Sequence, residues 1–325
     1  MGWYETVGRR AFFALDPERS HRAAIALLAL PLPWRSIGRA REDPRLATEV
    51  AGLGLSNPIG LAGGFDKGCA RMRSLGALGF GYVVGGTITL RPRAGNARPR
   101  IARDPDRRAL VNAMGLPNPG AEVAAARLAR SARTTSRWVS LADEELHEAV
   151  VALDLVAPHA DAIELNASSP NAGWAHRAAH VGELTAAFVG RTELPVFVKL
   201  PPFTDDATRE GVLAMAAAAS DAGAAGLTCG NTIPIEDVRM STGRGGLSGG
   251  PLTARTPAIV AAVHARTGGA LPIHACGGIF TPEDARACLE AGASTVQVYT
   301  GLIYEGPAIV GLLTRGLART GPATD

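Results

Sequence analysis

The feature that most constrains the fold of this 325-residue chain is a series of eight short apolar runs, separated by stretches with helical patterning. Each run is almost continuously apolar, as is typical of parallel strands that are buried on both faces. Because helical crossovers of regular length join the runs, the pattern predicts one closed (β/α)8 barrel. The predicted strands are residues 58–65, 81–89, 138–142, 162–168, 196–201, 226–232, 272–278 and 295–301.

Local signals mark the ends of the predicted helices. Gly76, Gly223 and Gly292 each stand in an Ala/Leu-Gly-Ala setting just before the next strand, where a helix can end. Thr281 is a predicted N-cap, because Pro282 and two acidic residues follow it. The same pattern of helix ends is expected around the whole barrel.

Two segments fall outside the repeat. Residues 91–119 are rich in Pro, Gly and Arg and are too long for a simple loop, so we expect an excursion over the mouth of the barrel. Residues 1–45 are predicted to form an N-terminal helical extension that precedes a barrel domain at 46–325. Aromatic and arginine residues alternate near its start, which fits either an amphipathic surface helix or a helix packed on the barrel.

Composition excludes several classes of protein. Lys and Arg exceed Asp and Glu by 33 to 30, and no basic block is interleaved with aromatics, so nucleic acid is not an expected partner. The four cysteines lack metal-ligand spacing and are expected to be buried free thiols. No apolar run reaches the roughly 20 residues of a membrane span. We expect a cytoplasmic protein, or one peripheral on the inner face of the cell membrane.

Lysine usage points to two positions. Of the 33 basic residues only Lys67 and Lys199 are lysines, so arginine serves almost wherever a positive charge is needed. A lysine retained against this bias is a site candidate, because its compact ammonium group can be tuned by burial. Lys199 falls near the end of the fifth run. There it could stabilise an anionic ring or form a Schiff base, and these roles distinguish a flavin enzyme from a lyase.

Asparagines gather where the predicted strands end. Asn166 and Asn231 end strands, Asn171 lies in the loop after the fourth strand, and Asn112 lies in the mouth excursion. Amides both donate and accept, so four of them could bind the carbonyl and N–H edge of a ring such as a pyrimidine. The other three asparagines neighbour Pro or Gly and better fit turns: Asn57, Asn96 and Asn118.

Glycines and hydroxyls complete the predicted site. Gly277 and Gly278 follow the seventh strand, residues 299–301 end the eighth, and residues 245–249 follow the sixth, where exposed N–H groups form a phosphate cradle in such barrels. Ser168 and Ser169 lie beside the amides, a fit place for a proton acceptor.

Histidines do not add a metal site to this prediction. His176 and His180 have the i, i+4 spacing of ligands, but they lack a third ligand, so no metal site is expected. His274 falls inside the seventh run and is expected to be packed in the core.

The chain resembles the dihydroorotate dehydrogenase family, which are FMN-dependent (β/α)8 barrels, from the N-terminus to about Leu313. The N-terminal segment 12–22, FFALDPERSHR, is similar to the class 2 branch, which is membrane-associated and uses quinone. In that branch N-terminal helices form the quinone entrance. The motifs that carry the resemblance are NPIGLAGGFDK (57–67), GNARPR (95–100), VNAMGLPNPG (111–120), LNASSPN (165–171), VKLPP (198–202), GGLSGGPL (245–252), CGGI (276–279) and VQVYTGLIYEGP (296–307).

The resemblance implies a role for each matched residue. Ser169 becomes the base that removes the C5 proton of dihydroorotate while hydride passes from C6 to flavin N5, and Lys199 stabilises the reduced flavin. The implied substrate contacts are Lys67, Asn112, Asn166, Asn171, Asn231 and Thr232. The implied flavin contacts are Ala62, Gly63, Lys67, Thr87, Asn166, Lys199, Gly246, Gly278, Tyr299 and Thr300.

The chain also departs from the family pattern. Residues 172–177 replace the TPGLR-type lid of class 2 members, Val139 to Asp143 replace an Asn-containing segment, and MGLPN and VKLPP are closer to class 1. A second hypothesis is therefore an FMN-dependent paralogue that acts on another cyclic substrate in a specialised pathway. A Schiff-base lyase using Lys199 and a non-catalytic ligand-binding barrel are the remaining alternatives.

Overall fold

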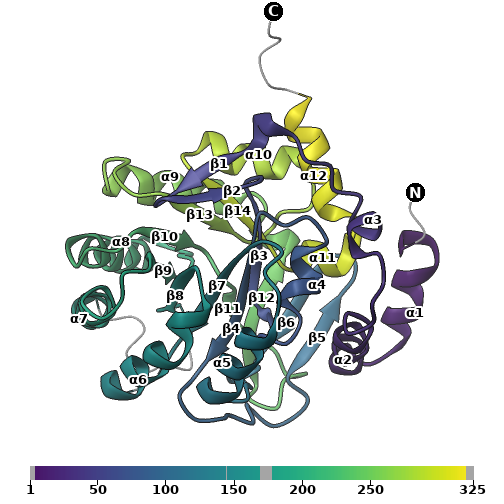
Figure 1. Cartoon of the computed structure of the whole chain (residues 1–325), viewed down its shortest axis with the longest axis horizontal. Helices are drawn as coiled ribbons and strands as arrows, with labels where there is room; N and C mark the ends of the chain where they lie inside the picture. The colour runs from purple at the N-terminus through teal and green to yellow at the C-terminus, as the bar shows by residue number, and fades with distance from the viewer. Residues whose placement is uncertain (1–3, 144, 169–177, 320–325) are drawn as a thin grey trace, which may run out of the picture.

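The computed structural model describes residues 4–143, 145–168 and 178–319, and its centre is a closed barrel of eight parallel strands (Figure 1). Every strand pairs with its neighbour along the chain, and the last pairs with the first. The eight predicted strands and the barrel are confirmed. The barrel strands are β3 (Ile59–Asp66), β4 (Tyr82–Ile88), β7 (Ser136–Leu141), β8 (Ala162–Asn166), β9 (Val196–Leu200), β10 (Gly226–Cys229), β13 (Ile273–Cys276) and β14 (Thr295–Val298).

Helices surround this barrel on its outer face (Figure 1). Thr281 caps α10 in a reciprocal capping box with Asp284, as the sequence predicts. Gly223 and Gly292 have positive φ angles just after α8 and α10, but Gly76 is the last residue of α4 and Gly79 takes the left-handed position there. The helices are α4 (Met72–Gly76), α5 (Ala121–Arg130), α6 (Leu146–Val156), α7 (Ala178–Val189), α8 (Asp206–Asp221), α9 (Arg255–Arg266), α10 (Pro282–Glu290), α11 (Thr300–Glu305) and α12 (Ile309–Ala318).

Aromatic side chains fill the amino-terminal end of the barrel. Tyr82 stacks on Trp138 with ring centroids 3.9 Å apart, and Trp138 stacks on Phe197 at 4.5 Å. The hairpin of β1 (Thr48–Val50) and β2 (Leu53–Leu55) packs against this cluster. His274 is fully buried beside it, as expected for a core residue, and burial lowers its pKa to about 3, so the ring is neutral. Aromatic side chains thus fill this end of the barrel, and the predicted site residues that the structure describes lie at the other end.

A four-stranded antiparallel sheet stands at the mouth of the barrel, in the order β11 (Ile233–Glu236), β12 (Arg244–Gly249), β6 (Ala109–Asn112) and β5 (Ile101–Asp104). Residues 91–119 supply two of its strands, so the predicted excursion is confirmed. Residues 245–249 were expected in a glycine loop but lie in β12. Gly246 pairs with Asn112, and a Cβ on Gly246 would lie 1.9 Å from the Thr232 hydroxyl. The glycine there permits close strand packing.

The N-terminal segment forms a helical turn at Tyr4–Gly8 and three helices, α1 (Arg9–Ala14), α2 (Pro17–Leu27) and α3 (Trp34–Gly38). In Figure 1, α1 and α2 lie at one side of the barrel, and α2 is next to β5. The Tyr4 hydroxyl donates to the Ile303 carbonyl oxygen at 2.7 Å. This segment therefore packs on the mouth of the barrel, and several of its apolar side chains stay exposed. Among the residues that the structure describes, no helix has the length and apolarity of a membrane span.

Candidate active site

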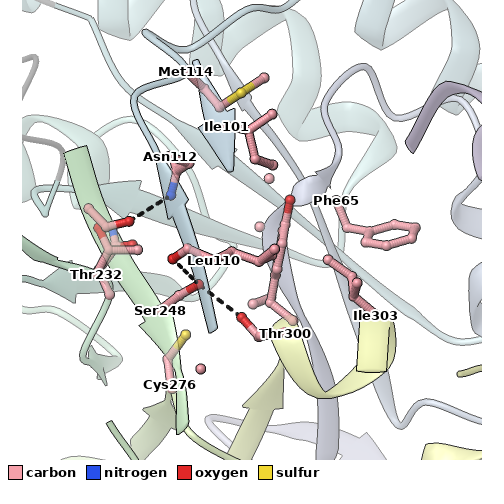
Figure 2. Close-up of a pocket in the computed structure, with 18 of the residues that line it drawn as sticks. Phe65, Ile101, Leu110, Asn112, Met114, Thr232, Ser248, Cys276, Thr300 and Ile303 are labelled. Carbon is pink, nitrogen blue, oxygen red and sulfur yellow. Dashed lines mark hydrogen bonds between the residues drawn. The ribbon is translucent and has the colours of Figure 1, made fainter. Parts of the chain in front are cut away.

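One cavity of about 1530 Å³ opens at the carboxyl ends of the barrel strands and continues beneath the N-terminal helices. Strand ends, the mouth sheet and α2 all line it, and Figure 2 shows part of this lining. Ser169, Asn171 and residues 172–177 lie outside the described residues. Every other predicted site residue lines the cavity, namely Ala62, Gly63, Lys67, Thr87, Asn112, Asn166, Lys199, Asn231, Thr232, Gly246, Gly278, Tyr299 and Thr300.

A chain of hydrogen bonds fixes the amides at the strand ends. Asn166 donates from Nδ2 to the Thr87 hydroxyl at 2.8 Å and accepts from the Ser168 hydroxyl at 2.7 Å. Asn231 donates to Ser168 at 2.7 Å, and Thr87 and Ser140 lie 3.1 Å apart through their hydroxyls. Asn166 and Ser168 are buried. The amides are thus held in defined orientations before any ligand arrives, which favours recognition of a planar polar ring.

The mouth sheet adds a second polar group of residues. Asn112 donates to the Gly246 carbonyl oxygen at 3.4 Å, Thr300 donates to the Ser248 hydroxyl at 3.0 Å, and Ser248 donates to the Leu110 carbonyl oxygen at 3.3 Å (Figure 2). Three elements distant in the sequence, β6, β12 and α11, therefore meet at one wall of the cavity. Asn57 and Asn118 instead bond backbone groups, as turn residues do.

The two lysines sit in different electrostatic surroundings. Lys199 is buried, and although burial opposes its charged form, the neighbouring Glu164 carboxylate attracts the ammonium group and its pKa is raised. Its Nζ lies 3.9 Å from Glu164 Oε1. Burial lowers the pKa of Lys67 to about 8, against the attraction of Glu18. Lys199 is therefore a fixed cation at neutral pH, whereas Lys67 titrates close to neutrality.

Glycines line the opposite end of the polar chamber. Gly278 has φ +71, and a Cβ there would lie 2.3 Å from the Thr253 backbone nitrogen, so no other residue fits without a shift. Tyr299 precedes α11 without a side-chain cap on the helix. No side chain therefore caps the first turn of that helix, where the N–H groups of Leu302 and Ile303 bond the Tyr299 carbonyl oxygen. This arrangement fits the phosphate cradle predicted after the seventh and eighth strands. Residues 245–249, which were predicted to join it as a loop, instead belong to strand β12, which lines the cavity.

The polar chamber fits a flavin on its own chemistry. Glu164 Oε1 and Gln297 Oε1 are buried without a hydrogen-bond partner among the described residues, and both side chains line the cavity. Fixed amides, a cationic Lys199 and a glycine-lined end match a ring with carbonyl and N–H groups that carries a phosphate. Within the described part of the chain, no cluster of three or more His, Cys, Asp or Glu could hold a metal ion.

The second chamber lies beneath the N-terminal helices and is largely apolar. Phe12, Phe13, Ala24, Leu27 and Leu28 line it. Its lining also includes polar residues, among them His21 and Arg103, which the sequence analysis did not single out.

Both of these polar side chains are fixed in place. His21 Nε2 lies 2.7 Å from the Phe65 carbonyl oxygen, and burial lowers the pKa of His21 to about 4. Arg103 donates to the Leu15 carbonyl oxygen and the Ser20 hydroxyl at 2.7 Å each. Neither residue carried a sequence signal of its own, because Arg is abundant in this chain and His21 lies far from every strand end.

The four cysteines are buried and free, as predicted. Cys276 nevertheless lines the cavity, beneath Ser248 in the view of Figure 2, so one thiol belongs to the site. Burial raises its pKa, which keeps the group a thiol at neutral pH.

Comparisons with known proteins agree with this geometry. The profile of the dihydroorotate dehydrogenase family matches residues 45–320. A relative named dihydroorotate dehydrogenase (quinone) from Anaeromyxobacter sp. (strain Fw109-5) is 40% identical and covers 96% of this chain and 91% of its own. One of the same name from Leifsonia xyli subsp. xyli is 37% identical over 97% and 98%. The crystal structure of DHODH in complex with ferulenol from Eimeria tenella has a TM-score of 0.83 at 29% identity, over 94% and 91%.

Fold and site thus define a (β/α)8-barrel enzyme with a polar ring-binding chamber joined to an apolar one. The chain belongs to the dihydroorotate dehydrogenase family, which are flavin-dependent oxidoreductases acting on CH–CH groups.

Proposed function

We propose that the enzyme binds FMN and oxidises dihydroorotate to orotate, with a quinone as electron acceptor, in pyrimidine biosynthesis. One observation carries this proposal: a single cavity joins the amide-lined chamber at the strand ends to the apolar chamber beneath the N-terminal helices. A reaction with a polar substrate and an apolar acceptor needs both chambers, and a cavity for a polar substrate alone needs only the first.

The residues of the polar chamber have two roles: some hold the flavin, and others bind the substrate. Lys199, Thr87, Asn166, Tyr299, Thr300 and the glycines hold the flavin, which supplies a hydride acceptor. Asn112, Asn231, Thr232 and Lys67 bind the substrate, with Lys67 facing its carboxylate. Ser169 accepts the C5 proton, and Asn171 contacts the ring, both as the family pattern implies. Fixed amides orient the ring before reaction, which lowers the cost of reaching the reactive geometry.

The apolar chamber fits the quinone. The cation of Arg103 lies where a quinone carbonyl needs a donor, within apolar walls, whereas uncharged His21 donates its one N–H to the Phe65 carbonyl oxygen. We propose that residues 1–45 form a quinone-facing extension of the barrel domain at 46–325. Val7, Leu15, Leu27, Leu30 and Leu32 are exposed there, and they support peripheral contact with the inner face of the cell membrane.

Anaerobic mixing tests the substrate assignment directly. Dihydroorotate should bleach the flavin absorbance of the purified yellow protein, and a short-chain ubiquinone added next should restore it. A flavin that stays oxidised with dihydroorotate but is bleached by another cyclic amide would instead identify a paralogue, the second candidate that the altered segment 172–177 favours.

The Schiff-base alternative is disfavoured by charge. A lysine must lose its proton to attack a carbonyl, and the raised pKa of Lys199 opposes that loss. Borohydride trapping of a carbonyl ligand on Lys199 in a colourless protein would overturn the flavin assignment.

A further inference from the structure

A buried carboxylate lies in the barrel at the base of the polar chamber. Glu164 is on β8, two residues before Asn166, and its side chain is 0% exposed. Oε2 accepts from the Thr228 hydroxyl at 2.9 Å and from the Gln297 amide at 3.2 Å. Oε1 accepts from no described residue, although it lines the cavity. A barrel interior is normally filled by apolar side chains, so this carboxylate requires a physical reason.

The cation nearest to this orphan oxygen is Lys199, with Nζ 3.9 Å away and a side chain 6% exposed. The register of β8 with β9 pairs Asn166 with Lys199, which places Glu164 one layer deeper in the barrel than the lysine. A distance of 3.9 Å is an ion pair without a direct hydrogen bond. The ammonium group of Lys199 is therefore attracted inward by Glu164 and still has donors free toward the cavity.

The groups that face this pair come from the other packed strands. Cys276 on β13 contacts Lys199, and Thr228 on β10 and Gln297 on β14 contact Glu164. Cys276 is the other titratable group beside Lys199, and burial raises the pKa of its thiol. The pair thus joins one carboxylate to one ammonium group, with the thiol of Cys276 beside the lysine.

We propose that Glu164 is a positioning residue for Lys199, and that the buried Glu164–Lys199 pair, rather than Lys199 alone, sets the reduction potential of the bound flavin. This inference rests on the proposed flavin site. Lys199 alone would favour the negatively charged reduced flavin strongly. Glu164 offsets that attraction, and it also keeps Lys199 charged in a place where burial opposes the charge.

The test is the midpoint potential of the flavin in Glu164→Gln, measured by dye equilibration between pH 6 and 9. At pH 6, where Lys199 is protonated, loss of the carboxylate should favour reduction by roughly tenfold, which is about 30 mV for a two-electron couple. Toward pH 9 this gain should disappear, because Lys199 without its carboxylate loses its proton at lower pH. Curves for Glu164→Gln and wild type that superimpose across this range would overturn the proposal.

Thr228→Val is the matched control. It removes one hydrogen bond to the same carboxylate, keeps the side-chain volume and leaves both charges of the pair in place. Its potential should therefore follow the wild type at every pH. A shift as large as that of Glu164→Gln would mean that packing, and not charge, is responsible.

A pair of variants covers the outcome in which Glu164→Gln does not retain flavin. Lys199→Met leaves Glu164 as an unpaired buried charge, so it should lose flavin on gel filtration more readily than the double variant Glu164→Gln/Lys199→Met. Equal losses would contradict a coupled pair. Absence of flavin from the wild-type protein would instead overturn the proposed function and is distinguishable from every result above.

Discussion

The two chambers of the cavity are built by different means. In the barrel chamber, Asn166, Thr87, Ser168 and Asn231 hold one another through hydrogen bonds of 2.7 to 2.8 Å. In the helical chamber, apolar side chains of α1 and α2 form the walls, and ion pairs at the rim attach the helices to the barrel.

Because the two chambers are built differently, we expect substitutions in them to have different effects on activity and on structure. Strand ends are held by the barrel on both sides, so loss of a side chain there alters chemistry more than structure. The helical chamber depends on docking: Glu18 of α2 bonds both Arg98 and Arg100, at 2.8 and 2.7 Å. Loss of that contact should alter structure first and quinone chemistry as a consequence.

The largest effect is expected in the barrel chamber. Ser169→Ala should slow reduction of the flavin by dihydroorotate by roughly 10²- to 10⁴-fold, because the proton acceptor is lost. Flavin content should not change. Ser168→Ala is the control, since that hydroxyl bonds two amides and should affect substrate affinity more than rate. Stopped-flow absorbance measures both, and a near-normal rate in Ser169→Ala would remove the serine from the mechanism.

The second effect separates the chambers. Deletion of residues 1–40 should lower kcat/KM for quinone by about 10- to 100-fold, since roughly 1.4–2.8 kcal/mol of apolar contact is lost. Reduction of the flavin by dihydroorotate should stay close to normal, because the barrel chamber does not need these helices for its hydrogen bonds. Equal activity of both proteins with quinone in the presence of liposomes would contradict a quinone chamber.

The third effect lies where the chambers meet. Burial lowers the pKa of Lys67 to about 8, so the ammonium is charged below that pH and neutral above it. The KM for the anionic substrate should therefore rise as pH increases through about 8. Lys67→Met should raise KM roughly 10- to 100-fold, as loss of a charged hydrogen bond does, and should abolish this pH dependence. Lys67→Arg keeps its charge at all these pH values, and persistence of the pH dependence in that variant would assign it to another group.

The smallest effect concerns helix docking. Hydrogen bonding from Arg100 lowers the pKa of Glu18 to about 2, below its ordinary value of 4.5. The pair thus stabilises the fold fully above about pH 4.5, and this contribution is lost as pH falls toward 2. Glu18→Gln should destabilise the protein at pH 7 by about 1–3 kcal/mol, measured by urea unfolding.

The exposed pair of Arg35 and Glu42 is the control for this prediction. Arg35→Gln should change stability by at most about 1 kcal/mol, as is usual for exposed ion pairs. Equal effects of Glu18→Gln and Arg35→Gln would mean that the Glu18 contact does not anchor α2.

The sequence alone determined the barrel, its strand order and most of the barrel chamber. Continuous apolar runs identify buried parallel strands, and strand ends meet at one face, so Asn166, Lys199 and Asn231 could be placed together without coordinates. The scarcity of lysine pointed to Lys67 and Lys199, which both line the cavity.

Only the tertiary structure decided the features that depend on contacts between distant segments, namely part of the cavity lining and the buried ion pair. His21 and Arg103 join the cavity only because α2 docks on β5, and Glu164 meets Lys199 only through the register of β8 with β9. For residues 245–249, the tertiary structure overrode a local signal. Their glycines suggested a loop, but pairing of Gly246 with Asn112 places them in a strand. Local pattern fixes which elements form, and pairing across the fold decides which side chains share a charge, a hydrogen bond or a cavity.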